Sequence, residues 1–245
     1  MRGVHRDLYR PRCGGIYGKE AEEVKKYELT SETKVFLGKT LYRIKALVQF
    51  GNVNAGDLGG WIEKEENLSQ YGNAWVYGNA EVSGNARVYG NAVVYGNAVV
   101  SGNARVYGNA VVYGNAVVDG NARVYGNAVV YGNAVVDGNA WVSGNAEVYG
   151  NAEVSGNARV SGNAEVCKIG TVFWIGAIGS RNGTTTFFRC KDGKIYVSCG
   201  CFLGDLEEFS DKVKQTHGDN EHGRVYMLAI EMAKARIVEE KNEVH

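Results

Sequence analysis

The sequence contains a single proline, carries no net charge and has no long apolar run. Lysine plus arginine and aspartate plus glutamate number 27 each, so nucleic acid or a membrane surface would need a local charged patch. No stretch of about 18 apolar residues could span a bilayer, and the basic N-terminus lacks the apolar segment of a signal peptide. Five irregularly spaced cysteines do not resemble the disulfide framework of a secreted domain. We therefore expect a cytoplasmic protein with no membrane partner.

Histidine is absent from the long stretch between His5 and His217. A general base must come within hydrogen-bond reach of the proton that it removes. Histidine-based chemistry is therefore restricted to the two ends of the chain. We assign no catalytic residue and expect no cofactor.

Glycine, in contrast, is abundant and recurs at a fixed interval. Disordered glycine-rich segments normally carry proline as well, so this composition favours ordered repetition. The motif Gly-Asn-Ala begins at Gly72 and last appears at Gly162, in sixteen hexads without an insertion. Each hexad reads Ala-x-Val-z-Gly-Asn: Ala and Val lie on one side of a short strand, and Gly-Asn tolerates the backbone angles of a sharp corner. A repeat this short predicts a solenoid.

The outward x residues repeat on a second period, of eighteen residues, and form three columns. The first is Trp75, Val93, Val111, Val129, Glu147 and Glu165. The second is Glu81, Val99, Val117, Val135 and Glu153. The third is Arg87, Arg105, Arg123, Trp141 and Arg159. We therefore predict a mainly β protein in which three hexads make one turn of a triangular prism with three parallel sheets, stacked at about 4.8 Å.

These hexads resemble those of the hexapeptide-repeat proteins, in which a small residue stands two positions before an aliphatic one. The resemblance implies a left-handed parallel β-helix. The flanking stretches GDLGGWIEKEENLS and IGSRNGTTTFFR are similar to those of uncharacterised bacterial and prophage members that are often labelled transferase-like. For the enzymes of this family the resemblance implies a histidine general base beside a loop that leaves the coils. This chain has neither feature among its sixteen hexads.

The repeat divides the chain into four parts. We predict a mobile leader at 1–24, an N-terminal β cap at 25–57, the β-helix at 58–178 and a C-terminal α+β domain at 179–245. The limits of the β-helix assume that Ile62 and Leu68 occupy alanine positions of an earlier coil, and that 170–172 and 176–178 continue the pattern. In the C-terminal part, 184–190 and 195–199 predict a hairpin. Two helical faces follow there, formed by Leu206, Phe209 and Val213 and by Val225, Leu228, Ala229 and Met232.

The valine columns predict self-association as a dimer or trimer along the prism. A monomer does not normally expose such contiguous apolar surface, and Glu81, Glu147 and Glu153 bound it as an interface rim would. The alternative is that the terminal domains fold back over the valines. The predicted interface consists of Val93, Val111, Val129, Val99, Val117, Val135, Tyr95, Tyr113 and Tyr131.

The arginine column has two interpretations. It is a polyanion site, with phosphates on guanidinium groups and bases stacked on the neighbouring tyrosines, or it is a soluble face on which arginine lies over tyrosine. Stacked like charges repel, and we expect Asp119 to relieve part of this repulsion at Arg123. The predicted anion-binding residues are Arg87, Arg105, Arg123 and Arg159.

The C-terminal domain contains a set of cysteines and histidines that could bind zinc. We expect Cys199 and Cys201 on one side of a strand, with Cys190 across the hairpin. The spacing matches no strong zinc motif, so free thiols are the alternative. The candidate metal ligands are Cys190, Cys199, Cys201, His217 and His222.

A polar turn precedes the predicted hairpin. Ser180, Arg181, Asn182 and Thr184 offer backbone amides, hydroxyls and a guanidinium to a phosphate or other small anion, or they form a plain turn.

These features favour a non-enzymatic, self-associating scaffold whose C-terminal domain binds a ligand or a protein. The resemblance to prophage proteins suggests a host nucleotide or host factor as that ligand. The alternative is a hexapeptide-repeat acyltransferase-like enzyme that uses His217 or His222 with a cysteine.

Overall fold

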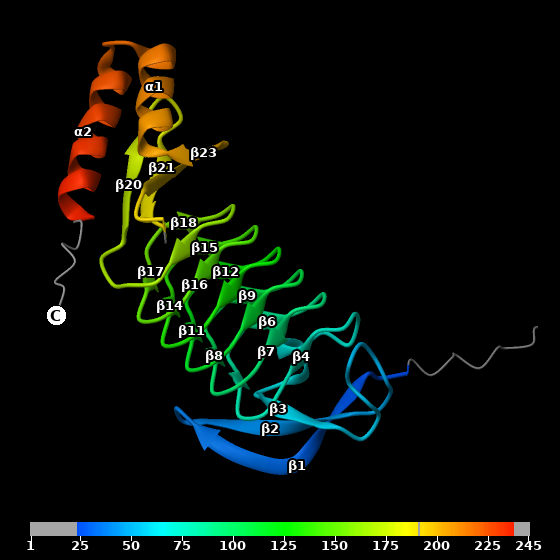
Figure 1. Cartoon of the computed structure of the whole chain (residues 1–245). Helices are drawn as coiled ribbons and strands as arrows, with labels where there is room; N and C mark the ends of the chain where they lie inside the picture. The colour runs from blue at the N-terminus through cyan, green and yellow to red at the C-terminus, as the bar shows by residue number, and fades with distance from the viewer. Residues whose placement is uncertain (1–23, 191, 238–245) are drawn as a thin grey trace, which may run out of the picture.

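The repeat folds into a parallel β-solenoid (Figure 1). In this computed structural model the described residues are 24–190 and 192–237, so the predicted leader lies almost wholly outside them. Each hexad contributes one two-residue strand, from β4 to β19. The strands are β4 (Trp75–Val76), β5 (Glu81–Val82), β6 (Arg87–Val88), β7 (Val93–Val94), β8 (Val99–Val100), β9 (Arg105–Val106), β10 (Val111–Val112), β11 (Val117–Val118), β12 (Arg123–Val124), β13 (Val129–Val130), β14 (Val135–Val136), β15 (Trp141–Val142), β16 (Glu147–Val148), β17 (Glu153–Val154), β18 (Arg159–Val160) and β19 (Glu165–Val166).

The register of these strands confirms the eighteen-residue turn. Val111 pairs with Val93 and Val129 in parallel ladders, and Arg105 pairs with Arg87 and Arg123. The coils therefore share three sheets, in the orders β19-β16-β13-β10-β7-β4, β18-β15-β12-β9-β6 and β5-β8-β11-β14-β17, the last extended by the cap. Each predicted column lies along one sheet.

Alanine and valine of every hexad fill the interior. From Ala74 to Val166 these side chains are fully or almost fully buried. The coils are joined by backbone hydrogen bonds, such as that from the Val93 N–H to the Ala110 carbonyl at 2.9 Å. A single coil has no other way to bury its apolar side, so the stack is stable only as a whole.

Glycine and asparagine have separate roles at the corners. Gly120 has a φ of +65°, and a Cβ atom there would lie 2.9 Å from the Gly138 nitrogen, so only glycine fits. The expectation that asparagine also supplies an unusual backbone angle is wrong, because no asparagine of the hexads has a positive φ. Its side chain instead links the coils: Asn121 Nδ2 donates to Asn139 Oδ1 at 3.0 Å, and the same contact repeats along all three edges.

The N-terminal cap covers the first coil. β2 (Lys39–Ala46) pairs antiparallel with β1 (Tyr27–Phe36) on one side and with β3 (Leu58–Ile62) on the other, and β3 then pairs in parallel with β5. Tyr27, Ile44 and Val53 join the core of the coils around Trp75. The 3-10 helix η1 (Glu65–Asn67) follows β3.

The first coil is out of phase with the expectation from the sequence. Ile62 pairs with Val82 and Leu68 with Val88, so both residues occupy valine positions rather than alanine positions. The pairing interval is twenty residues here and returns to eighteen at Val76, which pairs with Val94, so the two extra residues lie between Leu68 and Val76.

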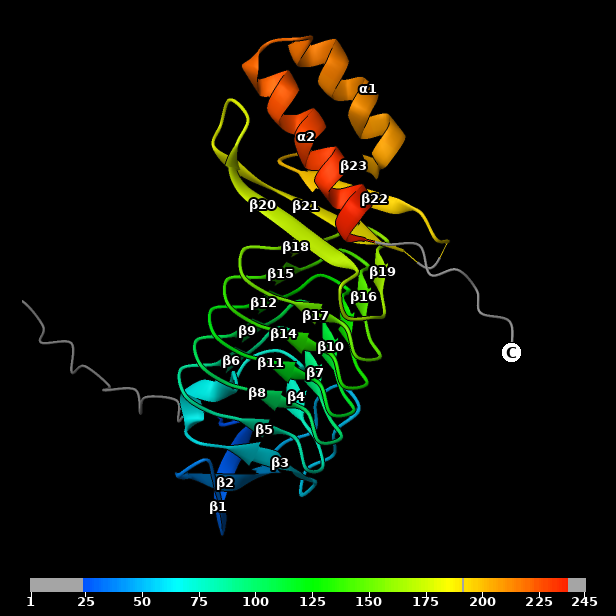
Figure 2. The same cartoon turned by 90° about the vertical axis from the view of Figure 1, so that its left-hand side faces the viewer.

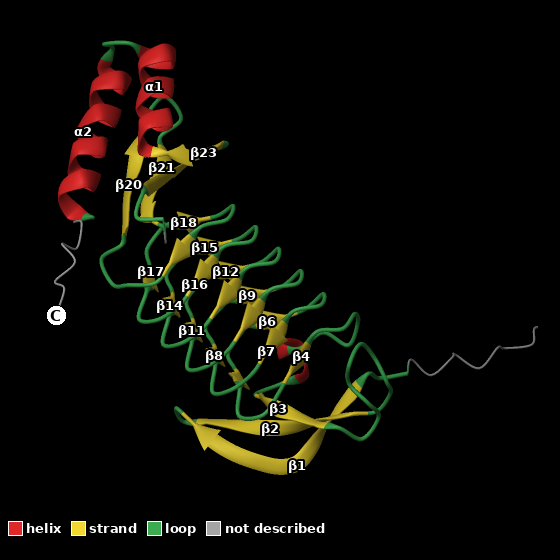
Figure 3. Ribbon diagram, viewed as in Figure 1, coloured by secondary structure: helices red, strands yellow, loops and turns green. Residues whose placement is uncertain are grey.

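The other end of the solenoid is closed by an antiparallel sheet (Figures 2 and 3). It consists of β20 (Val172–Ile178), β21 (Gly183–Arg189), β22 (Ile195–Cys199) and β23 (Phe202–Asp205). Residues 172–178 therefore do not continue the coils as expected: Val172 pairs antiparallel with Phe188 of β21. Alternation along β21 directs Phe188 into the core of the coils and Phe187 toward the helices.

Two helices, α1 (Leu206–His217) and α2 (Glu221–Arg236), pack on the outer side of this sheet. Phe209 and Val213 of α1 are buried as expected. On α2 the buried residues include Ala229, Ile230 and Ala233, whereas Leu228 and Met232 are more than half exposed. The buried face of α2 is therefore rotated relative to the predicted one, because α2 packs against both β20 and α1. No described helix is long and apolar enough to cross a membrane.

Candidate functional site

The solenoid has three outer faces with different chemistry. We call the five-stranded sheet with Arg87, Arg105, Arg123, Trp141 and Arg159 the arginine face. The six-stranded sheet with Val93, Val111 and Val129 is the valine–tyrosine face, and the third, with Val99, Val117 and Val135, is the valine–aspartate face. A functional site on the coils must use one of these three surfaces.

The arginines of the arginine face make no ion pair with any residue that the structure describes. Arg87, Arg105 and Arg159 are exposed, and Arg123 is half-buried. Within residues 24–190 and 192–237, none of the four guanidinium groups has a carboxylate or other hydrogen-bonding partner. Asp119 does not neutralise Arg123 as expected; it accepts a hydrogen bond from Ser101 Oγ at 2.8 Å.

Trp141 interrupts the row of arginines and contacts two of them. The guanidinium of Arg123 lies 5.0 Å from the ring centroid, and that of Arg159 lies 4.5 Å from it. Because β15 lies between β12 and β18, the two cations flank the ring from both neighbouring strands. Cation–π contacts of this kind are worth about 0.5–1 kcal/mol each at exposed sites.

The tyrosines of the arginine face stack on one another. The ring centroids of Tyr89 and Tyr107 are 4.8 Å apart, and those of Tyr107 and Tyr125 are 5.0 Å apart, with nearly parallel planes. Burial in the stack raises the pKa of Tyr107, and the neighbouring tyrosines raise it further while Arg123 and Arg105 oppose them. The expectation that bases stack on these rings is wrong for the inner ones, because their planes already face each other.

A cleft of about 580 Å³ opens where the arginine face meets the segment after η1. It is lined by Arg87, Arg105 and Tyr89 together with Glu65, Glu66 and Ser69. The cleft combines cationic, acidic and hydroxyl groups, which suits a ligand that carries both charge and hydroxyls.

The valine–tyrosine face is apolar and stacked along its length. Val93, Val111 and Val129 are each partly exposed, and the rings of Tyr113 and Tyr131 stack with centroids 4.9 Å apart. Burial raises the pKa of Tyr131 to about 12, with a smaller contribution from the Glu147 carboxylate. The full stack consists of Tyr95, Tyr113, Tyr131 and Tyr149.

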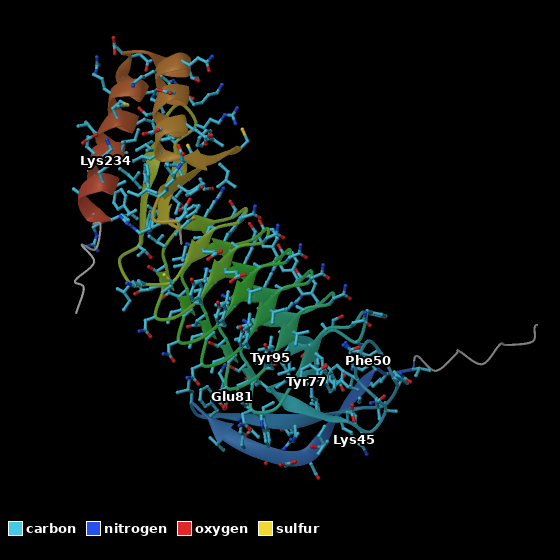
Figure 4. The ribbon with its side chains drawn as sticks, in the orientation of Figure 1. Lys45, Phe50, Tyr77, Glu81, Tyr95 and Lys234 are labelled. Atoms are coloured by element: carbon cyan, nitrogen blue, oxygen red, sulfur yellow. The ribbon has the colours of Figure 1, made fainter. Side chains whose placement is uncertain are left out.

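Neither terminal part of the described chain lies over the valine faces. Figures 1 and 2 show the cap at one end of the coils and the C-terminal sheet and helices at the other. The predicted alternative, in which the terminal domains fold back over the valines, is therefore wrong for residues 24–190 and 192–237. Figure 4 shows the labelled Tyr95 on the side of a coil and Glu81 beside the cap strands.

The valine–aspartate face carries a stack of acids beside its valines. Asp137 follows Val135, with Asp119 one coil before it and Glu153 one coil after. Burial raises the pKa of the Asp137 carboxyl, and the charges of Glu153 and Asp119 raise it further. Its Oδ1 atom has no hydrogen-bond partner among the described residues.

The C-terminal domain brings together a thiol, a phenol and two imidazoles. Cys199 Sγ accepts a hydrogen bond from Thr185 Oγ1 at 3.2 Å and lies 3.7 Å from the Tyr226 hydroxyl. Burial raises the pKa of Tyr226 to about 12, and contact with Cys199 adds to the shift. The ring of His217 lies 5.6 Å from that of Tyr226 and 5.8 Å from that of His222.

The sequence analysis missed Tyr226, although a signal was present. His222 and Tyr226 are four residues apart on α2, and residues at that spacing lie on one face of a helix. The side chain of Tyr226 also leaves no room for a Cβ atom at Gly179, so the polar turn after β20 lies next to this cluster.

The candidate metal ligands do not converge. The described residues contain no group of three or more histidine, cysteine or acidic side chains that could hold a metal ion. Cys190 and Cys199 lie at opposite ends of the β21–β22 hairpin, because Arg189 pairs with Ile195 and Thr185 with Cys199. Cys201 is exposed beyond the end of β22 rather than beside Cys199 on it.

The candidate anion-binding turn is an exposed hairpin turn. Ser180, Arg181 and Asn182 are exposed and Thr184 is half-buried. The Asn182 N–H donates to the Gly179 carbonyl at 3.2 Å, so that amide is already used within the turn. Anion binding by the remaining groups stays a prediction.

The repeat of this chain is similar to that of a described protein family. Residues 80–96, 86–102, 104–120 and 122–138 match the family model "YdcK Beta solenoid repeat". A 62-residue stretch is 37% identical to a protein of Escherichia coli (strain K12) named "Uncharacterized acetyltransferase YdcK". That alignment covers 22% of this chain and 19% of the relative. By its repeat, this chain is similar to a hexapeptide-repeat-like family of uncharacterised bacterial β-solenoid proteins.

Proposed function

We propose that this chain is a non-enzymatic scaffold that self-associates through its valine faces and presents its C-terminal domain for binding a ligand or a protein. The observation that carries the proposal is the pair of apolar faces left uncovered by the described terminal parts. Soluble monomers rarely expose apolar patches larger than a few hundred Å². A second copy of the chain supplies the same valine columns at the same spacing, so packing along the prism buries them efficiently.

The flanking acids support an interface limited to the middle of the coils. Glu147 follows the valines of the valine–tyrosine face, and Glu153 follows those of the valine–aspartate face. Glu81 precedes the latter valines but is buried in an ion pair with Lys34 of the cap, so it does not contribute to an exposed rim. A charged rim around an apolar centre is the usual arrangement of a protein interface. Both ends of the solenoid are closed by other elements, which leaves side-by-side packing as the route to association.

The test is the mass of the protein in solution, measured by light scattering over a range of concentrations. Wild type is expected as a dimer or trimer. Val111→Lys places a charge in the centre of the valine–tyrosine face, and Val117→Lys does the same on the valine–aspartate face. At least one of these changes is expected to give monomers.

Arg105→Gln is the matched control, because it occupies the same position of a coil on the third face. It is expected to leave the mass unchanged. A wild-type protein that stays monomeric at high concentration contradicts the proposal.

A second candidate function, acyl transfer, is supported by the C-terminal cluster. Tyr226 lies next to both His217 and Cys199, and the word "acetyltransferase" in the name of the E. coli relative suggests the reaction. The coils contain no histidine, so a base would have to come from this domain. Turnover of acetyl-coenzyme A that disappears in His217→Ala would establish this function and defeat the non-enzymatic reading.

A further inference from the structure

The arginine face carries four cations that have no ion-pair partner among the described residues. Arg87, Arg105, Arg123 and Arg159 have no carboxylate partner among the described residues, and three of them are exposed. Arginine presents planar donors that fit carboxylate, sulfate and phosphate groups in pairs of hydrogen bonds. Arg123 and Arg159 contact the Trp141 ring, but none of the four guanidinium groups has a hydrogen-bond acceptor among the described residues, so their N–H donors are available to an anion.

The cations form a straight row. Arg87, Arg105 and Arg123 pair in register in adjacent strands, one strand spacing or about 4.8 Å apart. Arg159 stands two strands beyond Arg123, across Trp141. No acidic residue occupies an outward position of these hexads; the others are Tyr89, Tyr107, Tyr125, Ser143 and Ser161. A row along the prism matches one extended anionic chain better than a compact anion.

The aromatic rings of this face are not open to bases. Proteins that bind single-stranded nucleic acid combine a cationic groove with ring planes on which bases stack. Here Tyr107 has a tyrosine on each side, and Trp141 is flanked by two guanidinium groups. The face therefore offers charge and the edges of rings, and it lacks a stacking platform along its centre.

Hydroxyl and carboxylate groups complete the site at its N-terminal end. Glu65, Glu66 and Ser69 line the same cleft as Arg87 and Arg105. A chain with charges alone would be repelled by Glu66, whereas a chain with free hydroxyls can donate hydrogen bonds to it. We propose that the arginine face binds a linear acidic polysaccharide, with its anionic groups on the arginines and its hydroxyls toward the tyrosine hydroxyls and the cleft.

The experiment measures the affinity of wild type for labelled polygalacturonate and heparin fragments by fluorescence anisotropy at several salt concentrations. The two probes distinguish a carboxylated from a sulfated chain. Binding to at least one is expected, and the affinity should fall as salt rises. Arg105→Gln combined with Arg123→Gln is expected to weaken binding at least about tenfold, because two charged contacts are lost.

The control is Lys212→Gln combined with Lys234→Gln, which removes the same charge from exposed positions of α1 and α2. This variant is expected to bind like wild type, and an equal loss in both variants overturns the proposal. Single-stranded oligothymidine that binds more tightly through the same arginines also overturns it, in favour of a nucleic-acid site. Failure of both polysaccharides to bind is equally decisive.

A measurement on wild type covers the case in which the arginine variant does not fold. Phenylglyoxal modifies exposed arginines, and mass spectrometry reports the extent at each position. Polygalacturonate or heparin should protect Arg105 and Arg123 and leave Arg236, exposed on α2, unprotected. Equal modification with and without the polysaccharides contradicts the proposal. The site lies on the face that the valines do not occupy, so its failure is independent of the test of self-association.

Discussion

Cationic side chains have opposite surroundings in the N-terminal cap and on the arginine face. In the cap, Lys34 pairs with Glu81 at 2.6 Å and Lys39 with Glu63 at 3.0 Å. These pairs join the cap strands to β5 and to the end of β3, so they fix the cap onto the first coils. In the cap, cations that hold elements together are paired with carboxylates. The arginines of the arginine face have no such carboxylates among the described residues.

Lys26 is the extreme case in the cap, because it is buried without a carboxylate. Only 4% of the residue is exposed, and Nζ donates to the Ala74 carbonyl at 2.8 Å. Burial lowers the pKa of Lys26 to about 8. The fold therefore bears the cost of a buried charge at neutral pH.

The largest effect that we predict follows from this shift. Above about pH 8 the folded protein releases the Lys26 proton, while the unfolded chain keeps it up to a pKa of about 10.4. The unfolded chain thus binds more protons in this window, so stability rises with pH there. Relative to Lys26→Met, the free energy of unfolding of wild type should rise by about 2–3 kcal/mol between pH 7 and pH 10.

The measurement is urea unfolding of both proteins at the two pH values. Tyrosines also titrate near pH 10, but they are present in both proteins and cancel in the difference. If the free energies of unfolding of wild type and Lys26→Met differed by the same amount at pH 7 and pH 10, the buried ammonium would not be destabilised.

The second effect comes from the Lys34–Glu81 pair. Only 12% of the Glu81 side chain is exposed, and its Oε2 atom already has no hydrogen-bond partner among the described residues. Lys34→Met leaves this carboxylate buried and unpaired, which should cost about 2 kcal/mol. In the double variant with Glu81→Gln, the loss should be smaller than the sum of the two single losses, as measured by urea unfolding.

Lys25→Met is the control for this pair. Lys25 contacts Glu65 at 2.8 Å, but both side chains are about half exposed. Exposed ion pairs contribute about 0–1 kcal/mol, so the loss should be small. Equal losses for Lys25 and Lys34 would mean that burial does not distinguish the two pairs.

The regular part of the fold could be predicted from the sequence because its period is strict. The columns of Arg87, Arg105 and Arg123 and of Val93 and Val111 follow from counting residues, and every pairing confirms them. Alanine and valine positions fix the interior in the same way. A strict repeat makes each unit's neighbours known in advance.

The ends could not be predicted, because there the tertiary partners decide. Residues 170–178 still match the hexad pattern of a small residue two positions before an aliphatic one. In the structure, however, β20 pairs with β21, and Phe188 of β21 covers the last coil. The shift at Ile62 depends on two extra residues between Leu68 and Val76, a stretch without a periodic signal. The ion pairs could not be predicted from the sequence either. Lys34 and Glu81 are brought together only because the cap hairpin folds beside the first coils.

The smallest predicted effect is on the arginine face itself. Arg105→Gln should change the free energy of unfolding by less than about 0.5 kcal/mol, because Arg105 is exposed and holds no other group in place. Its removal also relieves repulsion with Arg87 and Arg123 one strand away. Salt screens this repulsion over about 10 Å at 0.1 M, so added salt should stabilise wild type slightly more than the variant.

Lys39→Gln is the matched change in the cap, because it also removes one positive charge. Lys39 forms an ion pair with Glu63, and this pair is less exposed than the row of arginines. Added salt should weaken that pair, which is the opposite of its effect on the arginines. Urea unfolding at low and high salt separates the two responses. If Arg105→Gln instead lost more than about 1 kcal/mol, Arg105 would be a structural residue like the cap lysines, and its lack of a partner would no longer point to a ligand.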